Sequence, residues 1–320
     1  MAEQRYRKPQ VAGSTPVTSS RRENLILSFY YVKGMLGMDL CNLSVIKQIM
    51  ADAGITFRKE FGQNFLTNRM IPEDISENCT DDKNSLIIEI GPGIGCLTVE
   101  LASRYKKVVA IEIDKGLIPV LDRTLADYPN VTVINADVMK VDIARIVEDY
   151  SEGMPVSVCA NLPYYITTPI LMHLLECGVK FKSITVMVQN EVAARLSAKP
   201  GTSDYGAITA ALGYYGSVKK LFKVSAGCFI PVPKVDSAVV RIDLYDEPPF
   251  KPKNERTFRN IIKFAFEMRR KTLVNALSSK LSLPKERIIN AVISLGFNEN
   301  IRGERLSTEY FVRLSDLLTD

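Results

Sequence analysis

Residues 86–114, LIIEIGPGIGCLTVELASRYKKVVAIEID, decide the fold of this chain. A short apolar run leads into a glycine turn at 91–95, a helical pattern follows to about Tyr105, and a second apolar run ends at Glu112. This order predicts a strand, a glycine turn, a helix and a strand. Glycines let the turn approach a ligand closely, and the helix behind it points free N–H groups into the turn.

The acid that closes this unit indicates a nucleoside site. Glu112 follows Gly91 by 21 residues, a spacing that suits hydrogen bonds to ribose hydroxyls. A dinucleotide fingerprint requires G-x-G-x-x-G, but Cys96 stands where the third glycine belongs. Cys96 and the lack of an acid for a hydride site disfavour a nicotinamide dehydrogenase. The pattern, E-x-G-x-G-x-G from Glu89, resembles the first motif of S-adenosylmethionine-dependent methyltransferases.

Further strands repeat the scheme of an apolar run that ends in a polar residue. Residues 131–137 end at Asp137 and residues 156–161 end at Asn161, so four polar strand ends converge, counting Glu89 and Glu112. The fold class predicted is α/β: a doubly wound, mostly parallel Rossmann-like methyltransferase sheet with a small all-α C-terminal domain. Its remaining elements are expected as strands at 183–189, 219–224 and 235–243, the last two an antiparallel hairpin, and helices at 191–196 and 207–215.

Two stretches near the amino terminus are less regular. Pro72 is expected to open a helix. Residues 57–66 fit neither a helix nor a strand and carry two side-chain amides beside a glycine. Such amides can both donate hydrogen bonds to a ligand and accept them from it.

The composition favours an ordinary soluble protein, with 46% apolar and 24% charged residues. Six scattered cysteines without a C-x-x-C pair, and a single histidine, His173, suggest neither disulfides nor a metal site. We expect a cytoplasmic protein, and no apolar run approaches the length of a membrane-spanning helix.

Changes in composition divide the chain. Residues 1–37 are predicted to be a basic, disordered extension, 38–245 a methyltransferase domain, 246–252 a linker rich in proline, and 253–320 a helical RNA-binding domain. Residues 251–320 hold fourteen Lys/Arg against eight Asp/Glu, whereas residues 38–250 are net acidic. A basic tail on an acidic body suggests a bound polyanion, although a solvated helical surface explains the charge equally well.

The tetrapeptide Asn161-Leu162-Pro163-Tyr164 suits the methylation of an exocyclic amine. An amide oxygen and a backbone carbonyl can accept the two hydrogens of the amine, and an adjacent aromatic ring can stack on the base. No strong general base is needed, because a sulfonium is already an activated methyl donor.

Several motifs in order resemble the KsgA/RsmA family, the ribosomal RNA small-subunit adenine dimethyltransferases. The resemblance covers about residues 44–318 and departs from the family pattern at Asn190, where a lysine is usual. The motifs that carry it are FGQNFL (61–66), the glycine turn, NAD (135–137), NLPY (161–164), VQNEVAARL (188–196), PGTSDYG (200–206), FIPVPKVDS (229–237) and RRKTL (269–273).

This resemblance implies roles for individual residues. Cofactor contacts fall to Asn64, Leu66, Gly91, Glu112, Asp137 and Asn161, with Glu112 on the ribose and Asp137 on the adenine amine of S-adenosylmethionine. The Leu162 and Pro163 carbonyls would lie near the target N6, Tyr164 and Phe229 would sandwich the flipped adenine, and Arg269, Arg270 and Lys271 would hold RNA phosphates. Simpler readings are core packing for Leu66 and Phe229, a helix cap for Asp137 and a solvated helix end for the arginines.

The function so implied is the transfer of four methyl groups from S-adenosylmethionine to two adjacent adenosines near the 3′ end of 16S rRNA. The partner would be small-subunit rRNA in the 30S pre-ribosomal particle, and the protein would be a monomer. Two alternatives remain open: a resistance-type methyltransferase of 23S rRNA and a non-catalytic ribosome-assembly factor on the same fold.

Overall fold

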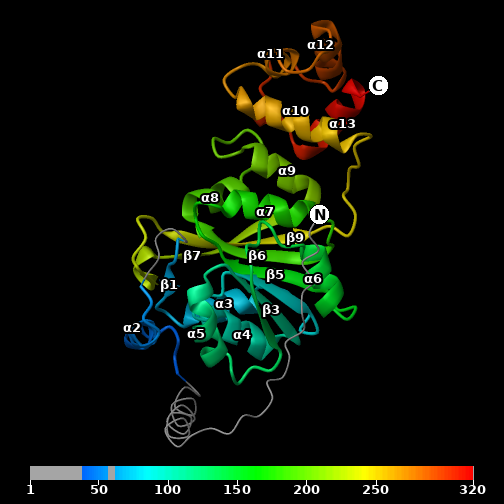
Figure 1. The fold of residues 1–320 in the computed structure, drawn as a ribbon. Helices are drawn as coiled ribbons and strands as arrows, with labels where there is room; N and C mark the ends of the chain where they lie inside the picture. Colours follow the sequence, from blue (N-terminus) through cyan, green and yellow to red (C-terminus); the bar gives the residue numbers. More distant parts are fainter. Residues whose placement is uncertain (1–37, 57–61, 320) are drawn as a thin grey trace, which may run out of the picture. The chain divides into compact units, whose positions relative to one another are not determined.

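The computed structural model describes residues 38–56 and 62–319, so the predicted extension at 1–37 lies outside the described residues. Residues 39–320 form one compact unit. Its centre is a seven-stranded sheet in the order β4-β3-β2-β5-β6-β9-β7 (Figure 1). The strands are β2 (Leu86–Ile90), β3 (Lys107–Glu112), β4 (Val131–Asn135), β5 (Val156–Asn161), β6 (Phe181–Gln189), β7 (Gly216–Val224) and β9 (Ser237–Leu244).

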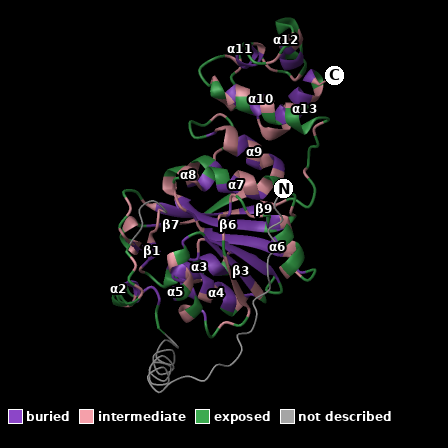
Figure 2. Cartoon of the chain, viewed as in Figure 1, coloured by how far each residue is buried: buried purple, intermediate pink, exposed green. Residues whose placement is uncertain are grey.

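The sheet is parallel from β4 to β6, and β9 runs antiparallel between β6 and β7. The predicted doubly wound α/β class is therefore confirmed. All five residues of β2 are buried, as expected for a central strand covered on both faces. Figure 2 shows the central strands of the sheet in purple, the colour of buried residues. The carboxyl ends of β2, β3 and β5 lie side by side, which places Glu89, Glu112 and Asn161 near one edge. The fourth predicted strand end is wrong by two residues, because β4 ends at Asn135 and Asp137 lies in the loop that follows.

Helices cover both faces of the sheet (Figure 1). One face packs against α6 (Ile143–Tyr150), α7 (Thr167–Glu176), α8 (Asn190–Leu196) and α9 (Ala207–Tyr215) in a single apolar core. The other face carries α3 (Met70–Glu77), α4 (Cys96–Arg104) and α5 (Ile118–Thr124), and α2 (Leu43–Asp52) precedes them in the chain.

Two local predictions need correction. Helix α3 begins at Met70, not at Pro72, because the Asn68 side chain accepts the Met70 N–H at 3.1 Å and proline is tolerated inside a first turn. Strands β7 and β9 are antiparallel neighbours as predicted, but their connection is not a simple hairpin turn. It contains β8 (Phe229–Ile230), which pairs with β1 (Phe65–Leu66) in a separate two-stranded sheet.

The segment at 246–252 connects β9 to a group of helices. These are α10 (Glu255–Glu267), α11 (Leu273–Ser278), α12 (Lys285–Ser294) and α13 (Thr308–Leu318), in agreement with the predicted all-α tail. Their apolar core also takes in Tyr205, Ala210 and Tyr214, from the loop before α9 and from α9 itself. Within the described residues, no helix has the length and apolar character needed to cross a membrane.

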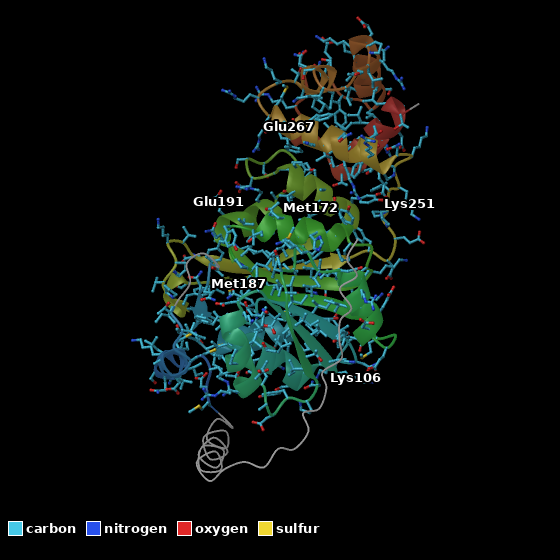
Figure 3. The ribbon with its side chains drawn as sticks, in the orientation of Figure 1. Lys106, Met172, Met187, Glu191, Lys251 and Glu267 are labelled. Atoms are coloured by element: carbon cyan, nitrogen blue, oxygen red, sulfur yellow. The ribbon has the colours of Figure 1, made fainter. Side chains whose placement is uncertain are left out.

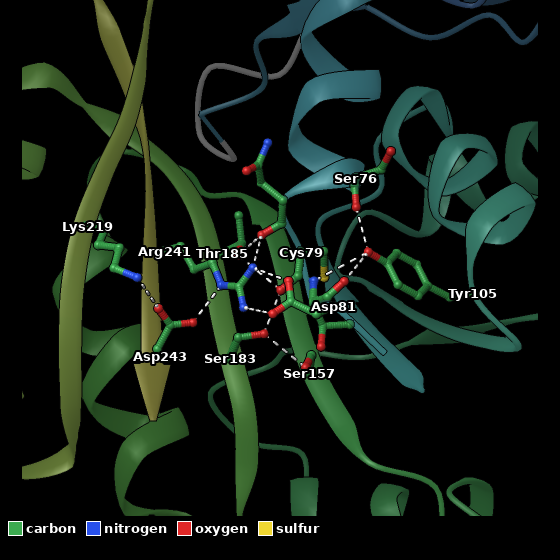
Figure 4. Close-up of polar contacts among 12 residues, drawn as sticks. Ser76, Cys79, Asp81, Tyr105, Ser157, Ser183, Thr185, Lys219, Arg241 and Asp243 are labelled. Atoms are coloured by element: carbon green, nitrogen blue, oxygen red, sulfur yellow. Dashed lines mark hydrogen bonds and ion pairs between the residues drawn. The ribbon is translucent and has the colours of Figure 1, made fainter. Parts of the chain in front are cut away.

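A polar cluster fastens the loop after α3 to the sheet. Arg241 of β9 lies 3.1 Å from Asp81 and 2.6 Å from Asp243, while Ser183 and Thr185 of β6 donate to the Cys79 carbonyl (Figure 4). These bonds hold the chain just before β2 in place, and β2 leads directly into the glycine turn.

Candidate active site

A recess lies at the carboxyl ends of β2, β3 and β5. Its wall is built by the glycine turn, by residues 62–66, by the end of β3 and by the turn that follows β5. Eight of the predicted site residues line it: Asn64, Leu66, Gly91, Glu112, Asn161, Leu162, Pro163 and Tyr164.

The glycine turn presents bare backbone to this recess. Gly91 has φ +70°, and a Cβ built there would meet nothing within 4 Å, so the space beside it is open to a ligand. Gly93 has φ +62°, and a Cβ there would lie 3.0 Å from Cε1 of Phe65. A side chain at Gly93 would therefore push against β1 and would also force a left-handed backbone that most residues avoid.

Glu112 is held in one orientation at the end of β3. Its Oε2 accepts the Gly93 N–H at 3.2 Å and its Oε1 accepts the Asp114 N–H at 2.8 Å. Burial raises the pKa of this carboxyl, and the two backbone donors counteract the rise. Each carboxylate oxygen keeps a further lone pair, so Glu112 can still accept hydrogen bonds from a ligand.

Glu89 is a second acid in the lining of the recess, and it is only 1% exposed. Its Oε2 is buried without a hydrogen-bond partner among the described residues. Burial raises the pKa of Glu89 to about 8, the neighbouring Thr98 side chain opposes this rise, and the Glu112 carboxylate adds to it. A buried carboxylate oxygen without a hydrogen bond makes the ionised acid costly, and a cation bound beside it would stabilise the charge.

The turn after β5 is braced from two sides. Asn161 donates from Nδ2 to the Asn64 carbonyl at 3.2 Å, and the Tyr164 hydroxyl lies 2.6 Å from the hydroxyl of Ser237. Burial raises the pKa of Tyr164. These contacts orient the amide and the ring at the mouth of the recess.

The two backbone carbonyls of this turn differ in their partners. The Pro163 carbonyl accepts the Ile166 N–H and the Thr167 hydroxyl, both at 3.2 Å. The Leu162 carbonyl accepts no hydrogen bond from the described residues. Leu162 therefore offers the better acceptor for an incoming amine.

A family model described as ribosomal RNA adenine dimethylase matches residues 54–320. The chain belongs to this family. It is 48% identical over 267 residues to the ribosomal RNA small subunit methyltransferase A of Lachnoclostridium phytofermentans, covering 82% of this chain and 92% of that protein. It is 45% identical over 285 residues to the protein of the same name from Streptococcus gordonii, covering 88% and 98%.

Two solved structures of methyltransferases share the fold. A dimethyladenosine transferase from Plasmodium falciparum matches with a TM-score of 0.67 and 26% identity, over 78% of this chain and 95% of that one. The 23S rRNA methyltransferase ErmE matches with a TM-score of 0.62 and 28% identity, over 79% and 99%. Family membership confirms the predicted class of enzyme, an S-adenosylmethionine-dependent rRNA methyltransferase.

The recess of this dimethylase fits S-adenosylmethionine on three observations. Gly91 leaves open space beside bare backbone, and the buried Oε2 of Glu89 is available for a cationic group such as the ammonium of the cofactor. Glu112 supplies fixed acceptors of the kind that ribose hydroxyls require.

Two of the residues predicted to contact the cofactor or the target base lie outside the lining of this recess. Asp137 accepts the Met139 N–H at 3.0 Å and lies 3.5 Å from Nζ of Lys140, so both contacts of its carboxylate are within its own loop. Phe229 is 2% exposed and pairs with Leu66 in the β1–β8 sheet. The structure does not bring either side chain to the recess, and their roles stay predictions.

The three basic residues of the tail have different surroundings. Arg269 lies 2.8 Å from Glu304 and donates to the Ser203 carbonyl at 2.6 Å, so it joins the loop before α9 to the tail helices. Arg270 and Lys271 are exposed and make no side-chain hydrogen bond or ion pair with the described residues. Their predicted contacts with RNA remain a proposal.

The recess also holds residues that the sequence predictions left out. Gln63 donates to Asp114 at 2.9 Å, and Phe65 packs on the glycine turn. The sequence places Glu89 among the converging polar strand ends but assigns it no contact of its own, although it is a polar residue inside an otherwise apolar strand. The other lining residues to which the sequence assigns no individual contact are Gly62, Pro92, Gly93, Cys96, Leu97, Ile113 and Leu117.

Proposed function

We propose that this protein transfers methyl groups from S-adenosylmethionine to the N6 amines of two adjacent adenosines near the 3′ end of 16S rRNA, four methyl groups in all. The observation that carries the proposal is the shared recess, into which both the glycine turn and the turn at 161–164 open. The names and high identity of the bacterial relatives favour the small subunit as the source of the RNA.

In this mechanism Glu112 holds the ribose of the cofactor, Asn64 and Leu66 form the wall beside it, and Glu89 pairs with its ammonium group. The bound cofactor supplies an electrophilic methyl group on a sulfonium. Asp137 is proposed to accept from the adenine amine of the cofactor. This requires its carboxylate to release the Met139 N–H when the cofactor binds.

Asn161 and Leu162 orient the target amine. Oδ1 of Asn161 and the Leu162 carbonyl accept the two hydrogens, which directs the nitrogen lone pair towards the donor. Asn161 is prepared for this task because its Nδ2 is already bound to the Asn64 carbonyl. The proton leaves after methyl transfer, so the chain needs no strong base.

Tyr164 provides a stacking surface for an adenine taken out of its stack. Phe229 is buried in β8 and pairs with Leu66 of β1, so it would support the wall that Leu66 forms. Arg270 and Lys271 would hold backbone phosphates, and Arg269 would act mainly through the loop it binds.

We further propose that the substrate is the 30S pre-ribosomal particle and that the protein acts as a cytoplasmic monomer. The rival large-subunit function has support in the fold shared with ErmE, but that identity is 28% against 48% for the small-subunit relative. A non-catalytic assembly factor would not need the braced amide of Asn161.

One experiment separates these functions. Purified protein is incubated with labelled S-adenosylmethionine and with 30S or 50S particles from a strain that lacks the corresponding modifications, and the rRNA is digested to nucleosides. We expect N6,N6-dimethyladenosine in 30S rRNA alone. Label in 50S rRNA would support the resistance-type enzyme, and cofactor binding without any label would support the assembly factor.

A further inference from the structure

The edge strand β7 carries one lysine whose charge is not neutralised. Lys219 lies 3.3 Å from Asp243, and Lys223 lies 2.6 Å from Asp236. Lys220 instead donates to Oδ1 of Asn190 at 2.7 Å. An amide carries no charge, so the ammonium of Lys220 has no acid beside it among the described residues.

Lys219 and Lys220 point to opposite faces of the sheet, because neighbours in a strand alternate. Lys219 joins the cluster of Asp243, Arg241 and Asp81 (Figure 4). Lys220 reaches the start of α8 through Asn190. The two lysines therefore share a strand and a residue type but differ in surroundings.

A polar pocket of about 400 Å³ lies next to Asn190, and we call it the Asn190 pocket. Its lining includes Glu191 of α8 (Figure 3), together with Lys234 and Asp236. Both acids are already paired, Glu191 with Arg195 at 2.9 Å and Asp236 with Lys223. Lys234 is exposed and has no acid partner among the described residues. With Lys220 at its edge, the pocket has an excess of positive charge.

The Asn190 pocket adjoins the proposed target site. The Tyr164 hydroxyl is hydrogen-bonded to that of Ser237, and Ser237 of β9 is paired with Gln189 of β6. The next residue of the chain, Asn190, donates its backbone N–H to the Asp236 carbonyl at 2.9 Å. Gln189, Asn190 and Asp236 all line the pocket. The ring that would stack on the target base and the pocket thus share the same end of β6 and β9.

We propose that the Asn190 pocket receives the nucleotide next to the target adenosine, with Lys220 and Lys234 on its phosphate. This inference rests on the proposed function, because the nucleotide belongs to the same rRNA. The ammonium groups of Lys220 and Lys234 have no acid partner among the described residues, so they suit an RNA phosphate, and the polar lining suits a ribose or a base edge. The neighbour would then be held in register while the target base is turned into the recess.

The test compares K220Q with K219Q in the full chain. Binding to unmodified 30S particles is measured over a range of salt concentrations, and dimethylation of each of the two adenosines is quantified from nuclease fragments by mass spectrometry. For K220Q we expect the slope of log K against log salt to fall by about 1, with a clear loss of methylation, whereas K219Q matches the native protein. Cofactor binding should be unchanged in both variants.

K220R keeps the charge and should restore the salt dependence. Equal behaviour of K220Q and K219Q, with the native protein active, would overturn the subsite and leave the proposed function intact. Absence of methylation by the native protein would instead refute the function itself. A K220Q variant with altered thermal unfolding or weakened cofactor binding would also count against the proposal, because it would place Lys220 in the structure of the enzyme.

Discussion

The side chain of Asn161 donates a hydrogen bond to the backbone carbonyl of Asn64, 97 residues earlier in the chain, at 3.2 Å. This bond leaves Oδ1 of Asn161 as the atom that can accept from a substrate amine. The amide is therefore oriented before any substrate arrives.

We expect N161A to lower the rate of methyl transfer by about 10²-fold, the scale of loss for a misplaced reacting group. Cofactor affinity should change far less. Single-turnover methylation of 30S particles measures the first quantity and calorimetry the second. Replacement N161D keeps an acceptor but loses the donor to Asn64, so an N161D enzyme with native activity would contradict the orienting role of this bond.

The hydroxyl and the ring of Tyr164 have separable roles. Y164F and S237A each remove the hydroxyl pair and should cost about 0.5–1.5 kcal/mol of stability, while methylation stays within a few fold of native. Y164A also removes the stacking surface, worth about 1–3 kcal/mol per base, and should reduce methylation by about 10-fold or more. Urea unfolding and the methylation assay report the two effects. An active Y164A enzyme would exclude stacking on this ring.

Glu89 makes the stability of the cofactor-free protein depend on pH. Its pKa is raised from 4.5 to about 8 by burial, so between these values the folded chain binds a proton that the unfolded chain has lost. Stability therefore falls as pH rises through this window, by at most about 1.4 kcal/mol per pH unit. Urea unfolding measures the free energy of unfolding at each pH, and this free energy should fall less with rising pH in E89Q than in the native protein. The same fall in both proteins would argue against a raised pKa of Glu89.

Cofactor binding gives the complementary test of Glu89. If its carboxylate pairs with the ammonium group, binding favours the ionised acid and affinity should rise with pH towards 8. E89Q should bind more weakly and lose this dependence. Calorimetry at several pH values measures the affinity. If E89Q shows the same pH dependence as the native protein, the dependence belongs to another group.

Substitutions of Arg269 and Arg270 should affect different properties, the first stability and the second RNA binding. R269A loses the bonds to Glu304 and Ser203, and we expect a loss of about 1 kcal/mol in unfolding free energy. R270A should unfold like the native protein but bind 30S particles with a salt slope smaller by about 1. Equal stability of the two variants would show that the Arg269 bonds contribute nothing in solution.

The central strands and the polar residues Glu89, Glu112 and Asn161 at their ends could be predicted from the sequence, because each strand is an apolar run that leads to a carboxylate or an amide. The pairing of β1 with β8 could not, since strands of two residues have no periodicity and their partners are remote in the chain. The same limit applies to side chains. Arg269 resembles Arg270 in sequence, and only the folded loop at Ser203 distinguishes them.

The pairing of Phe65 with Ile230 also affects how the protein is made. The segment that completes the amino-terminal wall of the recess is synthesised early, but its partner strand leaves the ribosome only after most of the sheet. A nascent chain that ends before β8 already contains the glycine turn and Glu112 but cannot close that wall. Cofactor capture must therefore await nearly complete translation of the catalytic sheet.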